Sequence, residues 1–189
     1  MSTPVARRIR RDLPVLDPAT TWCQLGTVLA PDDLVVAADY LVRRKRPLCT
    51  LEQLAAAAES MGSARGARAI RAALPRVRSG TDSPMESRLR LILIAAGLPE
   101  PVIGFVVKNQ YGDFVATPDL SYVKERIAIE YEGEIHRTDP NVYAADIERR
   151  ERLEEAKWLV IRVVKEHITL RRPWLLERVR TALAERAAL

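Results

Sequence analysis

The stretch Ile127-Ala128-Ile129-Glu130-Tyr131-Glu132-Gly133 decides how the rest of the chain is interpreted. Its β-branched and aromatic residues predict a strand, and alternation along a strand places Ala128, Glu130 and Glu132 on one face. Two carboxylates about 4 Å apart repel each other by roughly 4 kcal/mol at an effective dielectric constant of about 20. The pattern therefore indicates that a cation, a bound proton or a basic partner stabilises this face, and a metal-dependent site is the sharpest hypothesis.

Length, charge and cysteine content set the limits on fold and partners. The chain has 189 residues, of which 48% are hydrophobic, enough for one compact domain or for a domain with a helical annex. Residues 1–80 carry 13 Lys and Arg against 7 Asp and Glu, so the basic excess lies outside the acidic stretch. This distribution suits contact with a polyanion, and solvated helix faces give the same counts.

Neither a disulfide framework nor a membrane span is expected. Cys23 and Cys49 are too few and too far apart for a zinc motif or a disulfide framework, so both are expected to pack as small hydrophobes. No apolar run follows the arginines near the amino terminus, and no stretch reaches the length of a membrane span. The sequence therefore predicts a cytoplasmic protein.

The first part of the chain is predicted to be helical. Residues 1–18 are rich in Arg and Pro and predict an extended or mobile lead-in, and residues 19–80 predict an annex of four short helices. Thr20 or Thr21 is expected to cap the first helix, which would run to Ala30, and Thr50 with Gln53 predicts a capping box further on. The basic cluster at residues 43–46 either contacts phosphates or complements the carbonyl end of a helix in water.

Residues 81–189 are predicted to form an α/β domain. Ser83-Pro84-Met85-Glu86 is typical of a capping box that starts a helix, and a proline opens each of two later helices. The first three strands are expected to pair as a meander, whereas the fourth follows a helical crossover and should lie parallel to a neighbour. The expected strands span residues 102–107, 114–117, 127–133 and 158–164, and the later helices begin at Pro140 and Pro173.

Several short motifs in this second part occur together and in order. They are Ser83-Pro84-Met85-Glu86 with Leu89-Arg90, Pro118-Asp119-Leu120, Ile129-Glu130-Tyr131-Glu132-Gly133 with His136, and Asp146 with Arg149, Leu153 and Trp158. On these motifs the second part resembles the PD-(D/E)xK nuclease superfamily, in particular its very-short-patch-repair-like branch and a related actinobacterial domain of unknown function. The resemblance implies a restriction-endonuclease-like mixed β-sheet flanked by helices and preceded by the small all-α region.

The resemblance also implies a metal centre. Asp119 and Glu130 would converge on a divalent cation, with the backbone carbonyl of Tyr131 as a further ligand. Oxygen ligands that are few and rich in carboxylate favour Mg²⁺ or Mn²⁺ over zinc. Such a cation would lower the pKa of a bound water and neutralise charge on the scissile phosphate.

The chain departs from the superfamily pattern at the usual lysine, where it has Glu132. In the very-short-patch-repair-like branch an acid, a glycine and a histidine stand here, so His136 is carried over as a base or phosphate partner. The alternative is a surface histidine bonded to Asp139 or Glu134. Glu132 itself would bind a second metal or contact the ligands of the first metal. Alternatively, it would form a salt bridge to Arg149 or Arg162.

The remaining site residues come from other elements. Glu86 matches the acid that the first helix contributes in the superfamily. It would either cap the helix only, or cap the helix and also contact a metal-bound water. Lys108, Arg149 and Arg162 are expected to bind nucleic acid. A helix-ending glycine is usual in related domains at the position of Lys157.

Two classes of function remain open at this point. The first is a Mg²⁺-dependent DNA endonuclease with a role in repair or defence, and RNA hydrolysis cannot be separated from it by sequence. The second is a non-catalytic DNA-binding or antitoxin-like transcriptional regulator that retains the fold. Residues 13–80 resemble the segment that joins an abortive-infection-antitoxin-like winged helix to the nuclease-like domain in related proteins, which implies a possible toxin–antitoxin-type protein partner.

Overall fold

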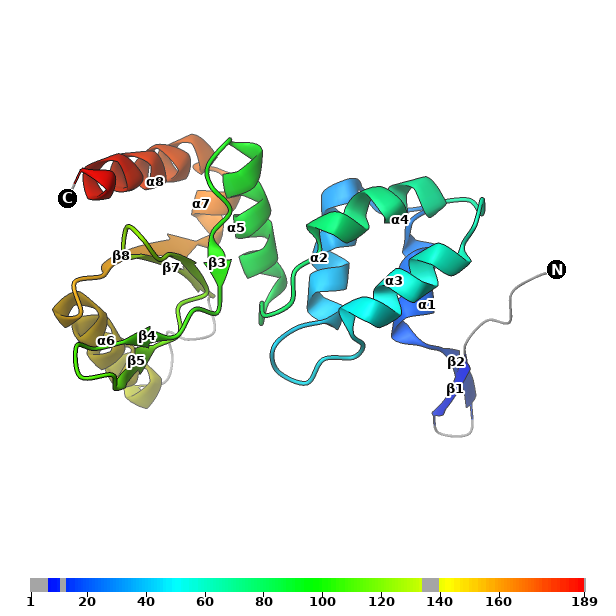
Figure 1. Ribbon diagram of the computed structural model, residues 1–189, viewed down its shortest axis with the longest axis horizontal. Coiled ribbons are helices and arrows are strands. Elements are labelled where there is room, and N and C mark those ends of the chain that lie inside the picture. The colour runs from blue at the N-terminus through cyan, green and yellow to red at the C-terminus, as the bar shows by residue number, and fades with distance from the viewer. Residues whose placement is uncertain (1–6, 11–12, 134–139, 189) are drawn as a thin grey trace. The chain divides into compact units, whose positions relative to one another are not determined.

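The computed structural model describes residues 7–10, 13–133 and 140–188 of the chain (Figure 1). The chain forms two compact units, Met1–Ser87 and Arg88–Leu189. The division falls inside helix α5 (Pro84–Ala95), a few residues after the boundary expected from the sequence. Within the described ranges, no helix is both long enough and apolar enough to cross a membrane.

The first unit is mainly helical. A short antiparallel hairpin stands where the sequence predicted an extended or mobile lead-in. The helices that follow are packed around a common apolar core that includes Trp22, Leu34 and Leu54. The elements are β1 (Arg7–Arg10), β2 (Leu13–Leu16), α1 (Pro18–Leu25), α2 (Pro31–Leu41), α3 (Leu51–Ser60), α4 (Ala67–Ala73) and the 3₁₀ turn η1 (Leu74–Arg76).

The start of α1 corrects one prediction. Its cap is Asp17, whose carboxylate accepts hydrogen bonds from the backbone N–H groups of Ala19 and Thr20, both at 3.0 Å. A cap at Thr20 or Thr21 was therefore wrong, because the carboxylate of Asp17 satisfies the first helical donors three residues earlier. The capping box of Thr50 and Gln53 is confirmed at the start of α3.

Close packing between two glycines holds part of this unit together. A Cβ atom on Gly26 would lie 2.9 Å from the carbonyl oxygen of Gly66, and Gly66 has a left-handed backbone with φ of +88°.

Both cysteines are free and buried, as expected for small hydrophobes. Burial raises the pKa of the Cys23 thiol to about 11, and the charge of Asp17 adds to this effect.

A four-stranded mixed sheet organises the second unit. Its strands follow the order β3-β6-β7-β8, with β3, β6 and β7 antiparallel and β8 parallel to β7. The crossover between β7 and β8 is helix α6, so the parallel fourth strand is confirmed. The elements are β3 (Val102–Ile103), β6 (Leu120–Tyr122), β7 (Ile127–Glu132), α6 (Pro140–Glu155) and β8 (Leu159–Val164).

The first predicted strand is divided in two. Val102 and Ile103 pair with β6, whereas β4 (Val107–Lys108) forms a separate hairpin with β5 (Phe114–Ala116). Gly104 lies between them with φ of +60°, a conformation that interrupts a strand and that glycine adopts without strain. The predicted hairpin is present, but it is not part of the meander.

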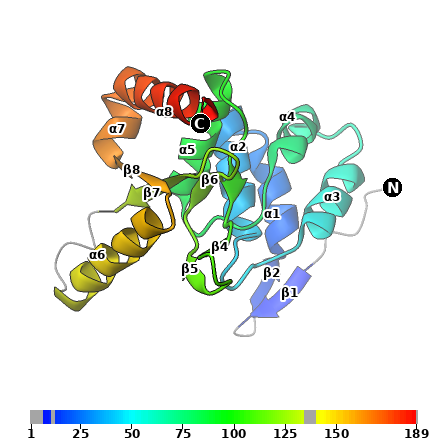
Figure 2. The same ribbon diagram turned by 60° about the vertical axis from the view of Figure 1, so that its left-hand side comes forward.

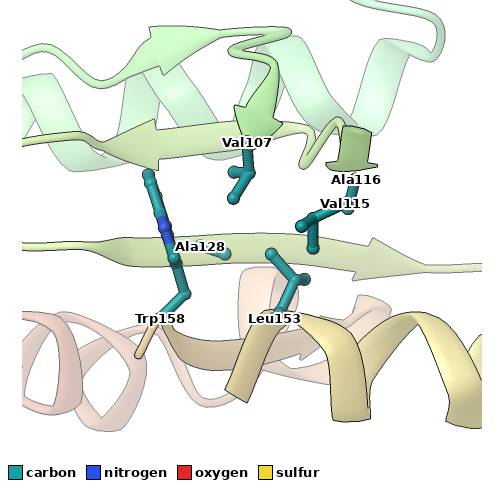
Figure 3. Packing of buried hydrophobic residues seen from close by; sticks show 6 residues of the cluster. All are labelled: Val107, Val115, Ala116, Ala128, Leu153 and Trp158. Carbon is teal, nitrogen blue, oxygen red and sulfur yellow. The ribbon is translucent and has the colours of Figure 1, made fainter. Parts of the chain in front are cut away.

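Helices cover both faces of the sheet (Figures 1 and 2). On one face, α6 and the β4–β5 hairpin pack against β7 through a cluster in which Ala128 and Leu153 are fully buried (Figure 3). On the other face, Ile161 of β8 lies beside Trp174 and Ala182 of the last helix. The helices after the sheet are α7 (Lys165–Thr169) and α8 (Arg172–Ala187). A mixed α/β fold with a helix-flanked mixed sheet is therefore confirmed.

Candidate functional site

The acidic residues of β7 lie where the strand approaches the edge of the core. Ile127 to Glu130 are buried, and Tyr131 and Glu132 are half-buried. The register pairs Leu120 with Ile129, and Asp119 directly precedes β6, where the printed pairing with β7 ends. Residues that face each other across an antiparallel pair project to the same side of the sheet. Leu120 and Ile129 therefore project to one side of the sheet, and Glu130 by alternation projects to the other side, with Ala128.

A hydrogen bond fixes the position of Asp119. Its Oδ2 atom accepts a hydrogen bond of 2.8 Å from the backbone N–H of Tyr131. This contact holds the carboxylate on the backbone of β7, at the residue that follows Glu130. The structure thus brings together Asp119, Glu130 and the Tyr131 backbone, the three groups that the sequence assigned to a metal.

The buried carboxylate of Glu130 is paired with an arginine. Glu130 is only 8% exposed, and its Oε2 atom lies 3.0 Å from Nη2 of Arg149 on α6. The helix that crosses over the sheet therefore supplies a counter-charge to the acidic strand. A buried carboxylate needs such a partner because leaving its charge unpaired away from water is costly.

Glu132 has an arginine of its own. Arg162 of β8 forms an ion pair with Glu132, although the parallel register places Arg162 beside Glu130. The side chains of Arg162 and Glu132 are 41% and 21% exposed, so this pair is partly solvated. Of the partners that the sequence left open for Glu132, the structure supplies Arg162.

Glu86 acts at the first turn of α5. Its backbone N–H donates to Oγ of Ser83 at 3.2 Å, and its Oε2 accepts from the N–H of Asp82 at 2.8 Å. The first contact is the Ser83 cap of the helix, and in the second the Glu86 carboxylate binds a backbone N–H just before the helix, at Asp82 instead of at the cap residue Ser83. The capping role expected of Glu86 is thus present.

Two predicted site residues remain, Lys108 and His136. Lys108 is exposed on β4, opposite Phe114. His136, together with Glu134 and Asp139, lies outside the described residues.

The donor set of the acidic site suits a hard divalent cation. In the described part of the chain, no group of three or more His, Cys, Asp and Glu side chains could hold a metal. Mg²⁺ commonly binds through one or two carboxylates and keeps several waters, so Asp119, Glu130 and a backbone carbonyl are sufficient ligands. The guanidinium of Arg149 places a positive charge beside Glu130, so a metal ion would compete with it for this carboxylate.

The basic cluster after α2 has local structural partners. Arg44 forms an ion pair with Asp82, and Lys45 lies 3.7 Å from the same carboxylate. Arg43 donates to the carbonyl oxygen of Tyr40 and lies over its ring at 4.2 Å. These contacts favour the structural interpretation of the cluster over phosphate binding.

An aromatic and basic cluster at the start of α8 was not predicted from the sequence. The guanidinium groups of Arg171 and Arg178 lie 4.8 and 5.3 Å from the ring centre of Trp174, and His167 lies 4.7 Å away. Trp174 also lines a groove of about 400 Å³ between β8 and α8. The spacing of Arg three residues before and four residues after a helical Trp could have predicted these contacts.

Comparisons with known proteins add two relatives. Both are uncharacterized proteins of Mycobacterium tuberculosis, one from strain CDC 1551/Oshkosh and one from strain ATCC 25618/H37Rv. Each is 26% identical to this chain over 151 residues, which cover 80% of this chain and 55% of the relative. The chain therefore spans about half the length of these relatives. No family model and no solved structure matches the chain.

Proposed function

We propose that this protein is a Mg²⁺-dependent endonuclease that hydrolyses phosphodiester bonds in DNA. The observation that carries the proposal is the hydrogen bond that holds the Asp119 carboxylate on the backbone of Tyr131, the residue that follows Glu130. One or two carboxylates, with water in the remaining positions, are a common ligand set for Mg²⁺. A restriction-endonuclease-like fold for the second unit is part of the proposal, and the mixed sheet with its helical crossover supports it.

In this proposal each acidic residue has a defined task. Asp119, Glu130 and the carbonyl of Tyr131 hold the cation, which supplies a more acidic bound water and neutralises charge on the phosphate. The hydrogen bond from Tyr131 keeps the Asp119 carboxylate oriented, so little reorganisation is needed when substrate binds. His136 is proposed as the base or phosphate partner that replaces the usual lysine, and Glu132 lies at the position of that lysine.

Arginines on two elements are proposed to bind the substrate. Arg149 of α6 and Arg162 of β8 lie on the acidic face, and both are partly exposed. A guanidinium binds phosphate through parallel N–H donors, which positions a backbone without reading its sequence. A cytoplasmic location and a role in DNA repair or defence are part of the same proposal. A toxin–antitoxin-type protein partner is proposed on the resemblance of the first unit alone.

One observation favours a second candidate, a non-catalytic DNA-binding or antitoxin-like regulator. Both carboxylates of the acidic strand, Glu130 and Glu132, form ion pairs with arginines. A fold that has lost its catalysis could keep such pairs because they neutralise the strand. The regulator would bind DNA through its basic residues and would cleave nothing.

The two candidates are separated by a cleavage assay on the purified chain. Supercoiled plasmid, linear duplex, single-stranded DNA and RNA are incubated with Mg²⁺, with Mn²⁺ or with a chelator. Asp119→Asn and Glu130→Gln each remove a ligand charge, and Glu125→Gln is the matched control on the turn at the other end of the same strands. We expect the two ligand variants to lose about two orders of magnitude or more in rate and the control to retain activity.

The outcomes of this assay distinguish the endonuclease from the regulator. Cleavage that survives Asp119→Asn and Glu130→Gln would show that another site or a contaminant is responsible. Absence of cleavage under every condition, together with salt-sensitive DNA binding, would favour the regulator. Preferential hydrolysis of RNA would change the substrate but keep the metal site.

A further inference from the structure

The ion pair between Arg149 and Glu130 lies where the proposed cation would bind. Nη2 of Arg149 is 3.0 Å from Oε2 of Glu130. The side chain of Glu130 is 10% exposed, whereas that of Arg149 is 36% exposed. The carboxylate is therefore the buried member of the pair, and the guanidinium is the member that solvent and a ligand can reach.

A cation and this guanidinium compete for one carboxylate. A divalent cation that binds Glu130 would lie close to the positive charge of Arg149, in a site largely shielded from water, where like charges repel more strongly than in solvent. Cation binding is therefore weak while Arg149 stays in place. A phosphate group offers Arg149 another anionic partner, with a geometry that suits a guanidinium as well as a carboxylate does.

We propose that Arg149 couples the binding of the divalent cation to the binding of the nucleic-acid backbone. Without nucleic acid, Arg149 occupies Glu130 and keeps the affinity for the cation low. When a phosphodiester reaches the site, the guanidinium moves to the phosphate and leaves Glu130 to the cation. This inference rests on the proposed function, and it adds that the site is assembled only when substrate is present.

The coupling is reciprocal by thermodynamic necessity. If the phosphate backbone raises the affinity for the cation by some factor, the cation raises the affinity for the backbone by the same factor. The proposal therefore makes two measurable statements, one about cation binding alone and one about DNA binding with and without a cation. Neither statement needs catalytic turnover.

The first measurement is Mn²⁺ binding without DNA, followed by the electron paramagnetic resonance signal of free Mn²⁺. Arg149→Gln removes the competing charge, so we expect Mn²⁺ to bind roughly fivefold or more tightly than to the wild type. Arg150→Gln removes one positive charge from the neighbouring position of α6 and is the matched control, with an expected change within about twofold. Arg149→Lys keeps a positive charge and should leave the affinity close to that of the wild type.

The second measurement is the affinity for a short labelled DNA duplex, from fluorescence anisotropy at constant ionic strength with Ca²⁺ or with a chelator. In the wild type we expect Ca²⁺ to increase the affinity roughly fivefold or more, and in Arg149→Gln we expect this factor to fall close to one. Arg150→Gln should weaken DNA binding in both conditions and keep the factor.

The results separate this inference from the proposed function. Unchanged Mn²⁺ affinity in a folded Arg149→Gln would overturn the coupling, even if the wild type cleaves DNA. If Arg149→Gln does not fold, a wild type whose DNA affinity is independent of Ca²⁺ overturns it equally. Tighter Mn²⁺ binding by Arg149→Gln in a protein that cleaves nothing would support the coupling and reject the endonuclease.

Discussion

The carboxylate of Asp119 accepts a hydrogen bond from the backbone N–H of Tyr131 at 2.8 Å, so its orientation is set by the neighbouring strand β7. Tyr131 directly follows Glu130 on β7, and Asp119 directly precedes β6, the strand that pairs with β7. This hydrogen bond therefore holds the carboxylate of Asp119 beside the residue that follows Glu130. The same bond gives Asp119 a structural task that can be separated from its proposed role as a metal ligand.

Substitutions at Asp119 should separate these two roles. Asp119→Asn keeps an oxygen that can accept the hydrogen bond, whereas Asp119→Ala leaves the N–H of Tyr131 without this acceptor. We expect Asp119→Ala to lower the free energy of unfolding by roughly 1–3 kcal/mol and Asp119→Asn to lower it by less. Both should abolish metal-dependent cleavage. Urea denaturation measures the stability, and equal losses in the two variants would contradict the structural role of the bond.

The ion pair between Glu132 and Arg162 should contribute little and depend on salt. Both side chains are partly exposed, so water and counter-ions screen the attraction. A double-mutant cycle with Glu132→Gln and Arg162→Gln should give a coupling energy of about 0.5–1 kcal/mol at low ionic strength. The value should fall as salt is raised.

A second pair on α8 is the control for this cycle. Glu177 and Arg180 are 3.8 Å apart and more exposed, with 73% and 47% of their side chains accessible. Their coupling energy should stay below about 0.5 kcal/mol. A larger value for the α8 pair than for Glu132 and Arg162 would contradict this account of screening.

Local patterns explain which elements could be predicted from the sequence. The strand at residues 127–132, the capping box of Thr50 and the helix opened by Pro140 depend on alternation and on residues three or four positions apart. The parallel position of β8 followed from the helical crossover, because a strand that returns through a helix enters the sheet in the same direction.

Long-range contacts explain what could not be predicted. The pairing of Arg149 with Glu130 joins residues 19 positions apart on different elements, so it depends on how α6 packs on the sheet. Glu132 had two candidate arginines, and sequence alone could not choose between them, because strand register and side-chain direction decide the contact. The pairing of β3 with β6, and not with the hairpin, depends on the backbone of Gly104. The positive φ of Gly104 leaves no periodic signal in the sequence.

The environment of His167 predicts a pH dependence of stability. Burial, followed by the charges of Arg171 and Arg178, lowers the pKa of His167 below its usual value of 6.5, and Glu166 acts in the opposite direction. The folded protein therefore binds this proton more weakly than the unfolded chain. The stability that His167 contributes is present above about pH 6.5 and is lost as the pH falls through the lowered pKa.

This dependence can be measured in a background that lacks the other histidine. In His136→Gln, the free energy of unfolding should decrease as the pH is lowered from 6.5 through the pKa of folded His167. His167→Gln keeps a side chain able to accept the hydrogen bond that Val164 donates, and it should make the profile flatter in this range. An imidazole pKa above 6.5 in an NMR titration would contradict the prediction.

The end of helix α6 predicts a stabilising substitution. Lys157 adopts φ of +66°, a left-handed conformation in which its Cβ atom crowds the backbone. Its N–H donates to the carbonyl of Glu154, and the N–H of Trp158 donates to that of Leu153, as in a helix terminus that usually carries glycine. Lys157→Gly removes the strain but increases the entropy of the unfolded chain, so we expect a net gain of about 0.5–1 kcal/mol.

The matched control for this gain is Lys157→Ala. Alanine removes the long side chain but keeps the Cβ atom that causes the strain, so the change in the free energy of unfolding should stay within about 0.5 kcal/mol. The carbonyl of Lys157 accepts a hydrogen bond from Arg186 at 3.0 Å, and neither substitution removes this backbone acceptor. A gain with alanine as large as with glycine would show that the lysine side chain, and not the left-handed backbone, lowers the stability of this terminus.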